Sequence, residues 1–153
     1  MAKRPTSPPA TIEQIDTSMV EGFIGYSARR ASLAIVETFM QRMKVHELGP
    51  VNFTLLGLIG SNPGIMSSQL CALLKIKSSN LVGLVNQLHG RGLVERQPHP
   101  NDVRAWGLHL TPQGSRFMRK AQATALAAGL EATAALTDEE RDSLAALLRK
   151  IYR

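Results

Sequence analysis

The chain has little cysteine, few aromatic residues and no long apolar run. Among 153 residues it has one cysteine, Cys71, so an intrachain disulfide is impossible and no oxidising compartment is required. No apolar run approaches the roughly 20 residues that span a bilayer. The N-terminal MAKRPTSPPAT is basic but lacks the apolar core of a secretory signal. We therefore expect a cytoplasmic protein that does not interact with membranes.

Catalytic and metal-binding motifs are also missing from the sequence. It contains no HExxH, no paired Cys-x-x-Cys and no glycine-rich phosphate loop. Its histidines are widely spaced on different predicted elements, and Cys71 is expected to pack as a small apolar residue. We predict neither an enzyme nor a bound cofactor. The four histidines are His46, His89, His99 and His109.

The charge is biased towards the positive sign. Lys and Arg number 18 against 12 for Asp and Glu, a formal net charge of +6, and 44% of the residues are hydrophobic. The length and the apolar fraction suit one globular domain with a sizeable core. The positive excess is compatible with a polyanionic partner such as a nucleic acid, although charge alone does not establish one.

The N-terminal third predicts an arm followed by a long helix. Residues 1–16 are proline-rich and are expected to form a flexible arm. Thr17 or Ser18 can begin a helix that runs to about His46. Its apolar residues form two rows, which predict two buried faces. One face can pack on the domain's own core, and the other needs another helix, a partner subunit or a ligand cavity.

The rest of the chain predicts five more helices and one β-hairpin. A helix from Pro50 to Ser61 is followed by a short helix capped by Ser67 or Ser68 and by one from Ser78 or Ser79 to about Gly90. Strands are predicted at 93–97 and 104–110, with a turn between them. The next helix spans 112 to about 135, and a capping box, Thr137 with Glu140, begins the last one.

The helix at 78–90 has the two faces that a DNA recognition helix needs. A stripe of Leu81, Leu84, Val85 and Leu88 can attach it to the domain. The opposite face has short polar groups that could approach base edges, and none of them is acidic. A solvated surface helix more often carries several Glu and Lys residues. That opposite face consists of Ser78, Ser79, Asn80, Val82, Gly83, Asn86 and Gln87.

The predicted hairpin is rimmed by arginine, which favours a DNA-binding wing. Arg91, Arg96 and Arg104 lie around it, and a thin basic wing can enter a narrow minor groove. Asp102 can pair with Arg104 and orient it. The alternative is an ordinary surface turn whose ion pair contributes about 0–1 kcal/mol to stability.

These segments together resemble the MarR family of bacterial transcription regulators. The resemblance covers Leu48 to Gly114 and rests on LGPVNFTLL, LCALLKIKSSNLVGLVNQLHGRGLVER, the wing tip NDVR and the exit LTPQG. The sequence departs from the family pattern at Gly49, Gly83 and Val103. The resemblance implies a winged helix-turn-helix fold and a homodimer on a near-palindromic operator. It also implies a small-molecule effector, in this family often an aromatic acid.

We therefore predict a mainly α fold with a small β-wing, divided into an arm (1–16), a helical dimerisation region (17–48 and 112–153) and a winged DNA-binding lobe (49–111). The predicted function is sequence-specific transcriptional regulation, as a repressor released by a ligand. The alternatives are a protein-interaction module without DNA binding, an activator or ligand-independent regulator, and a small enzyme. The predicted DNA-binding residues are Lys75, Lys77, Ser78, Ser79, Asn80, Val82, Asn86, Arg96, Asp102 and Arg104, and the predicted ligand-binding residues are Phe23, Tyr26, Arg29, Arg30 and Phe53.

Overall fold

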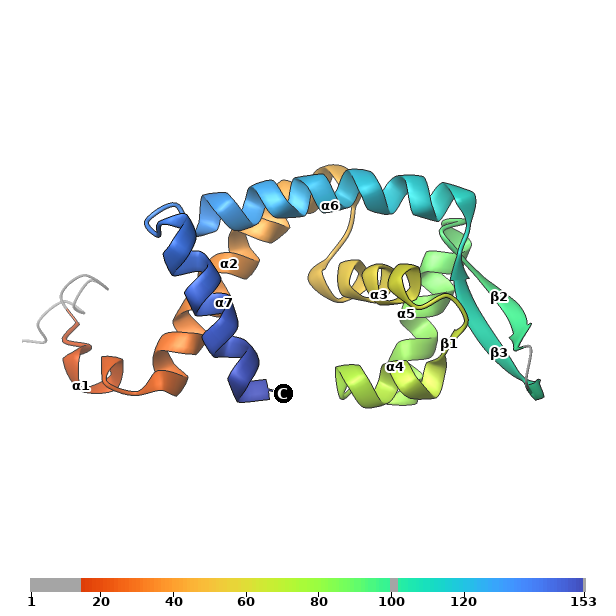
Figure 1. The fold of residues 1–153 in the computed structure, drawn as a ribbon, viewed down its shortest axis with the longest axis horizontal. Helices are drawn as coiled ribbons and strands as arrows, with labels where there is room; N and C mark the ends of the chain where they lie inside the picture. The colour runs from red at the N-terminus through yellow and green to blue at the C-terminus, as the bar shows by residue number, and fades with distance from the viewer. Residues whose placement is uncertain (1–14, 100–101, 153) are drawn as a thin grey trace, which may run out of the picture. The chain divides into compact units, whose positions relative to one another are not determined.

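A computed structural model describes residues 15–99 and 102–152, with the side chains of 99 and 102–105 outside that description. The chain divides into two compact units, residues 1–34 and 35–153. Figure 1 shows that most of the described chain is helical and that the strands form one small sheet. The predicted fold class, mainly α with a small β-wing, is confirmed. The predicted arm, 1–16, lies almost entirely outside the described residues.

The first unit contains a helix break that the sequence analysis did not predict. One helix was expected from Thr17 or Ser18 to about His46, but α1 (Ser18–Glu21) ends at Gly22 and α2 (Ile24–Met43) starts anew. Glycine costs a helix about 1 kcal/mol, and the break leaves the carbonyl of Glu21 to accept a hydrogen bond from the Ser27 hydroxyl at 3.2 Å. The predicted single helix is therefore wrong at this point.

The start of α1 also differs from the predicted cap. The Asp16 carboxylate accepts a hydrogen bond from the Ser18 backbone N–H at 2.9 Å, whereas Thr17 directs its hydroxyl to Glu21. The bond from the Ser18 backbone, assisted by the Ser18 side chain, lowers the pKa of Asp16 below its ordinary value. Asp16 thus satisfies a backbone donor that helix geometry leaves open.

The second unit continues with η2 (Lys44–His46), a tight turn, and α3 (Pro50–Ser61). Pro50 occupies the first turn of α3 as expected, since a proline lacks the N–H that would stay unpaired there. Leu55, Leu56 and Ile59 are fully buried along one side of α3. The predicted bounds of this helix are confirmed.

The next elements are β1 (Ile65–Met66), α4 (Ser67–Leu74) and α5 (Ser78–Gly90). Serine side chains were expected to cap α4 and α5, but the N-cap residues are Met66 and Lys77. At α4 the Gln69 side chain accepts from the Met66 backbone N–H at 2.9 Å. The serines instead occupy the first helical positions, so the helices exist as predicted but begin differently.

The sheet is antiparallel, with strand order β1-β3-β2, where β2 is Val94–His99 and β3 is Asp102–Leu110. The hairpin was expected, although both strands extend further towards the turn. The strand β1 was not expected, because two residues carry no periodic signal. It pairs Ile65 with Leu108 and Met66 with Gly107. A Cβ on Gly107 would lie 2.8 Å from the Cα of Gly64, so glycine permits this close approach.

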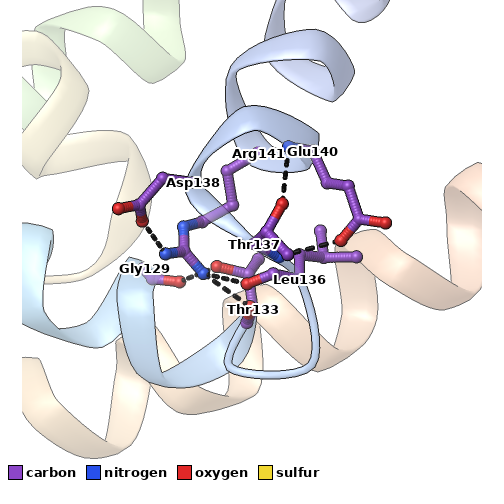
Figure 2. A network of polar contacts seen from close by, with 7 residues as sticks. All are labelled: Gly129, Thr133, Leu136, Thr137, Asp138, Glu140 and Arg141. Carbon is purple, nitrogen blue, oxygen red and sulfur yellow. Dashed lines mark hydrogen bonds and ion pairs between the residues drawn. The ribbon is translucent and has the colours of Figure 1, made fainter.

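The chain ends with α6 (Pro112–Ala132) and α7 (Asp138–Tyr152). The predicted capping box is confirmed: Thr137 N–H donates to Glu140 Oε2 at 2.8 Å, and Glu140 N–H donates to Thr137 Oγ1 at 3.2 Å. Figure 2 shows that Arg141 also fixes the corner between α6 and α7. Its guanidinium donates to the carbonyls of Thr133 and Leu136, at 3.1 and 2.5 Å, and pairs with Asp138.

The hydrophobic core of the second unit lies between α3, α4, α5, the sheet and α6. Leu70 of α4, Leu108 of β3 and Ala121 of α6 are each at most 1% exposed. Elements from across residues 35–153 thus share one core, which determines where α5 and the hairpin sit. Within the described ranges, no helix is both long and apolar enough to span a membrane.

Candidate nucleic-acid interface

The two faces of α5 are separated as the sequence predicts. Leu81, Val85 and Leu88 are at most 2% exposed and attach the helix to the core. Leu84 is half-buried beside them. The opposite face projects short side chains away from the domain and contains no acidic group. Its exposed residues are Ser78, Ser79, Asn80, Val82, Gly83, Asn86 and Gln87.

The turn before α5 places two lysines at the N-terminus of that helix. Lys75 has the left-handed backbone conformation (φ 52°) and ends α4, and Lys77 is the extended N-cap residue of α5. Both are exposed, whereas Ile76 between them packs against the core. The helix dipole and both ammonium groups therefore create a positive potential at this end of α5.

The hairpin contacts α5 through one of its faces. Arg96 pairs with the buried Leu108 in the sheet and lies on the face of β2 that also carries the buried Val94. From there its Nη2 donates a hydrogen bond to Asn86 Oδ1 at 2.8 Å. Two predicted DNA-binding residues, from different elements, are thus brought into direct contact. Trp106, paired with Pro98 further along this face, is 56% exposed.

Two predicted wing residues cannot be placed in the same detail. Asp102 and Arg104 lie in β3, where Asp102 pairs with His99 in the backbone register. Their side chains fall outside the described part of the chain, so the expected pairing of Asp102 with Arg104 remains a prediction.

The base of the hairpin explains why threonine and glycine follow the second strand. The Thr111 hydroxyl accepts from Gly114 N–H at 2.9 Å and donates to the Gly92 carbonyl at 2.6 Å, which joins the start of α6 to the start of the hairpin. A Cβ on Gly114 would lie 1.9 Å from the carbonyl oxygen of Leu93. These contacts fix the direction in which the hairpin leaves α5.

Arg91 points away from the wing, although the sequence analysis grouped it with the wing arginines. Its guanidinium donates to the carbonyls of His46 and Glu47, at 2.9 and 3.0 Å. It also lies over the ring of Phe117, 5.1 Å from the centroid, and His46 meets that ring edge-on. Arg91 therefore joins the end of α5 to the η2 turn and α6, and is not a DNA-facing group.

A second contact to the exposed face of α5 comes from α3. Asn52 is only 9% exposed, and its Nδ2 donates to Gln87 Oε1 at 3.1 Å. Its own Oδ1 is buried and has no partner within the described chain. The sequence analysis did not single out Asn52. An isolated asparagine inside an apolar helix was the available signal, but its partner 35 residues away could not be read from the sequence.

The predicted ligand-binding residues are distributed over both units. Phe23, Arg29 and Arg30 are exposed in the first unit, and Tyr26 is half-buried there. Phe53 belongs to the second unit and contacts Phe39 edge-on, with ring centroids 5.4 Å apart.

A cavity within the second unit lies between α3 and α6. Its volume is about 580 Å³, and Phe53, Leu58 and Met118 provide an apolar part of its lining. Arg119 and Gln122 add polar groups. Among the described residues, the Arg119 guanidinium has no hydrogen-bond or ion-pair partner.

An apolar groove lies between α6 and α7, with a volume of about 500 Å³. Leu126, Leu130, Leu144 and Leu148 line it and are each at least 39% exposed. No group of three His, Cys, Asp or Glu residues among the described side chains is arranged to bind a metal ion.

Comparisons with known proteins agree with this architecture. Residues 46–105 match the model of the MarR family. One relative is a transcriptional regulatory protein for the hcr operon of Thauera aromatica. It is 32% identical to this chain, and the match covers 86% of this chain and 80% of the relative. The transcriptional repressor CouR, solved on a 23-mer DNA duplex, is 29% identical, with a TM-score of 0.84 over 92% of this chain and 99% of CouR.

A more distant structure shares the fold alone. The Mycobacterium tuberculosis MarR family protein RV2887, solved with p-aminosalicylic acid, is 20% identical, with a TM-score of 0.71 over 86% of this chain and 99% of that protein. The family match covers α3 to the hairpin, the part of the chain that builds the exposed face of α5. The family-model match, the 32% identical relative and the shared fold together show that the chain belongs to the MarR family of transcriptional regulators.

Proposed function

We propose that this chain regulates transcription by binding DNA sequence-specifically, with α5 in the major groove and the β2–β3 wing beside the minor groove. Ser78, Ser79, Asn80, Val82 and Asn86 face the bases in this proposal, and Val82 can contact a thymine methyl group. Lys75, Lys77 and Arg96 provide positive charge near the phosphates. Arg104 enters the minor groove, with Asp102 orienting it.

The observation that carries the proposal is the exposed face of α5. It presents hydroxyl and amide groups, no carboxylate, and a positively charged N-terminus, on a helix attached by buried Leu81, Val85 and Leu88. Such a helix can enter a groove without repelling phosphate. The likeness to CouR, a transcriptional repressor that was solved bound to a DNA duplex, supports DNA binding by this chain.

The test is a binding titration on DNA from upstream of the chain's own gene, beside an unrelated duplex, at two salt concentrations. We expect selective binding that weakens steeply with salt, because each phosphate contact releases counterions. Lys75→Ala should weaken binding and reduce the salt slope by about 0.9. Lys120→Ala removes the same charge from α6 and should change little. Equal, weak binding to both duplexes would favour the interaction-module alternative.

We also propose a homodimer formed through the helical regions at both ends of the chain. The α6–α7 groove supports this, because an exposed apolar patch of this kind usually marks an interface. Arg141 fixes the corner between the two helices and so keeps the groove in one shape. A second copy also supplies the two-fold symmetry that a near-palindromic operator requires.

Sedimentation equilibrium tests the dimer with a matched pair of substitutions. Leu126 in the groove and Leu73 on α4 are similarly exposed, 64% and 61%. Leu126→Glu should shift the protein towards monomers, because it places a charge in the interface. Leu73→Glu should leave the dimer intact. If Leu126→Glu remains a dimer, the α6–α7 groove is not part of the dimer interface.

Repression relieved by a small effector completes the proposal. The cavity beside Phe53 has the volume of a small-molecule site. The free guanidinium of Arg119 suits an acidic ligand, and Arg30 is one of the two arginines that the sequence analysis predicted to bind the ligand. An effector releases DNA only if it binds the DNA-incompetent conformation more tightly.

Salicylate is a suitable first probe, because RV2887 was solved with the related p-aminosalicylic acid. Release of the labelled duplex would be measured for the wild type, Arg119→Ala and Arg30→Ala. The variant that needs more salicylate identifies the anchor. If salicylate releases DNA equally from all three proteins, neither arginine binds it.

A further inference from the structure

Two neighbouring amides on the exposed face of α5 are oriented by other elements of the fold. Asn86 Oδ1 accepts from Arg96 Nη2 of β2 at 2.8 Å, and Gln87 Oε1 accepts from Asn52 Nδ2 of α3 at 3.1 Å. In both cases the carbonyl oxygen is bound to the domain. The NH₂ groups of Asn86 and Gln87 have no partner within the described chain.

The orientation of Asn86 follows from the chemistry of arginine. A guanidinium has five N–H donors and no acceptor, so the amide atom that faces it must be the oxygen. Rotating the amide by 180° would place its NH₂ against the N–H groups of Arg96. Asn86 therefore presents donors to the outside, and Arg96 retains further N–H donors next to it.

The orientation of Gln87 follows from its contact with Asn52. The buried Asn52 donates from Nδ2 to Gln87 Oε1, so the Gln87 amide turns its oxygen towards α3. Gln87 therefore also presents an NH₂ group.

Gly83 brings this part of α5 within reach of a base edge. It lies almost one turn before Asn86 on the outermost line of the helix, and a Cβ there would meet nothing within 4 Å. Without a side chain, the helix backbone can approach a groove more closely than any other residue would allow. Position 83 therefore makes no base contact of its own, but the closer approach of the helix brings Asn86 nearer to the bases.

We propose that Arg96 and Asn52 are positioning residues that turn the NH₂ groups of Asn86 and Gln87 outward, and that Asn86 therefore selects guanine in the major groove. This inference rests on the proposed DNA binding. Guanine presents two adjacent acceptors there, N7 and O6, whereas cytosine presents a donor and adenine presents one donor and one acceptor. An unconstrained asparagine would instead pair with adenine through both amide atoms.

Selection from a randomised duplex library tests the inference with wild type, Asn86→Ala, Arg96→Ala and Lys75→Ala. The position that loses its preference in Asn86→Ala is the one that Asn86 contacts, and the wild type should select guanine there. Arg96→Ala frees the amide and should admit adenine at that position. Lys75→Ala removes a charge but no amide contact, so it should bind more weakly with guanine retained.

Base analogues in the selected sequence identify the atoms. Replacing that guanine by 7-deazaguanine removes N7 and should weaken wild-type binding about tenfold, which is 1.4 kcal/mol. Inosine lacks only the minor-groove amino group and should bind nearly as well as guanine. Asn86→Asp, whose outward oxygen can only accept, should lose the guanine preference. Urea unfolding of each variant separates these effects from loss of structure.

The outcomes are distinct. If the wild type enriches no sequence, the proposed DNA binding fails, and this inference fails with it. If sequences are enriched but Asn86→Ala changes no position, or the wild type selects adenine or cytosine at the Asn86 position, only this inference fails. An unchanged guanine preference in Arg96→Ala would show that Arg96 does not orient the amide.

Discussion

The contact between Gly114 and Leu93 allows a quantitative prediction for Gly114→Ala. A Cβ at position 114 would lie 1.9 Å from the carbonyl oxygen and 2.8 Å from the carbonyl carbon of Leu93, both backbone atoms. Ordinary contact begins at 3.4 Å, so the start of α6 and the start of the hairpin would have to separate by about 1.5 Å. No side-chain rotation can relieve this clash.

The separation would also disrupt the hydrogen bonds around Thr111. They run from Thr111 Oγ1 to the Gly92 carbonyl, from Gly114 N–H to Thr111 Oγ1, and from Thr111 N–H to the Leu93 carbonyl, at 2.6, 2.9 and 3.1 Å. Overpacking costs about 1–3 kcal/mol and a lost cap about 1 kcal/mol. We therefore expect Gly114→Ala to lower the free energy of unfolding by about 2–4 kcal/mol.

Urea unfolding followed by far-UV circular dichroism measures this loss, at one protomer concentration because a dimer's stability depends on it. Gly83→Ala is the matched control. A Cβ there meets nothing within 4 Å, and alanine should stabilise the helix by up to about 1 kcal/mol. If Gly114→Ala unfolds within about 0.5 kcal/mol of the wild type, the argument from backbone contact is refuted.

Three further predictions concern other parts of the second unit. Leu81→Ala removes a side chain that is 1% exposed and should cost about 2–5 kcal/mol in urea unfolding, whereas a loss below about 1 kcal/mol would show that the core can collapse around the gap. Arg91→Lys should cost about 1–3 kcal/mol, because one ammonium cannot reproduce the planar fork to two carbonyls and the contact over Phe117; wild-type stability in that variant would contradict this account. The pKa of Glu139 lies below its ordinary value of 4.5. The larger cause is the hydrogen bond from its own backbone N–H at the start of α7, and the next is the hydrogen bond from the Thr137 hydroxyl. Its carboxylate therefore stabilises the fold above about pH 4.5 and loses this effect as the pH falls through the lower folded pKa; an NMR titration midpoint at or above 4.5 would exclude the helix-start interaction.

Local chemistry determined much of this protein from the sequence alone. Pro50 and the pair Thr137 with Glu140 marked helix starts correctly, because capping involves residues only a few positions apart. The stripe around Leu81 identified the buried face of α5, since a helix repeats every 3.6 residues whatever it packs against. The family resemblance followed from the same local segments in their order.

Contacts between distant residues were decided only by the tertiary structure. The strand β1 forms because its backbone pairs with β3. Since β1 has only two residues, it shows no strand periodicity that the sequence could reveal. Arg91 was grouped with the wing because it is close to the wing in sequence. In the structure its guanidinium instead donates to the carbonyls of His46 and Glu47, which precede it by more than 40 residues.

The chemistry of the candidate interface shows the same division. The sequence shows that α5 exposes amides, because its apolar stripe fixes which side faces out. Which amide atom points outward depends on Arg96, ten residues later, and on Asn52, 35 residues earlier. A hydrogen bond between side chains on separate elements requires both elements to be packed first, so residue types and spacing alone do not determine its direction.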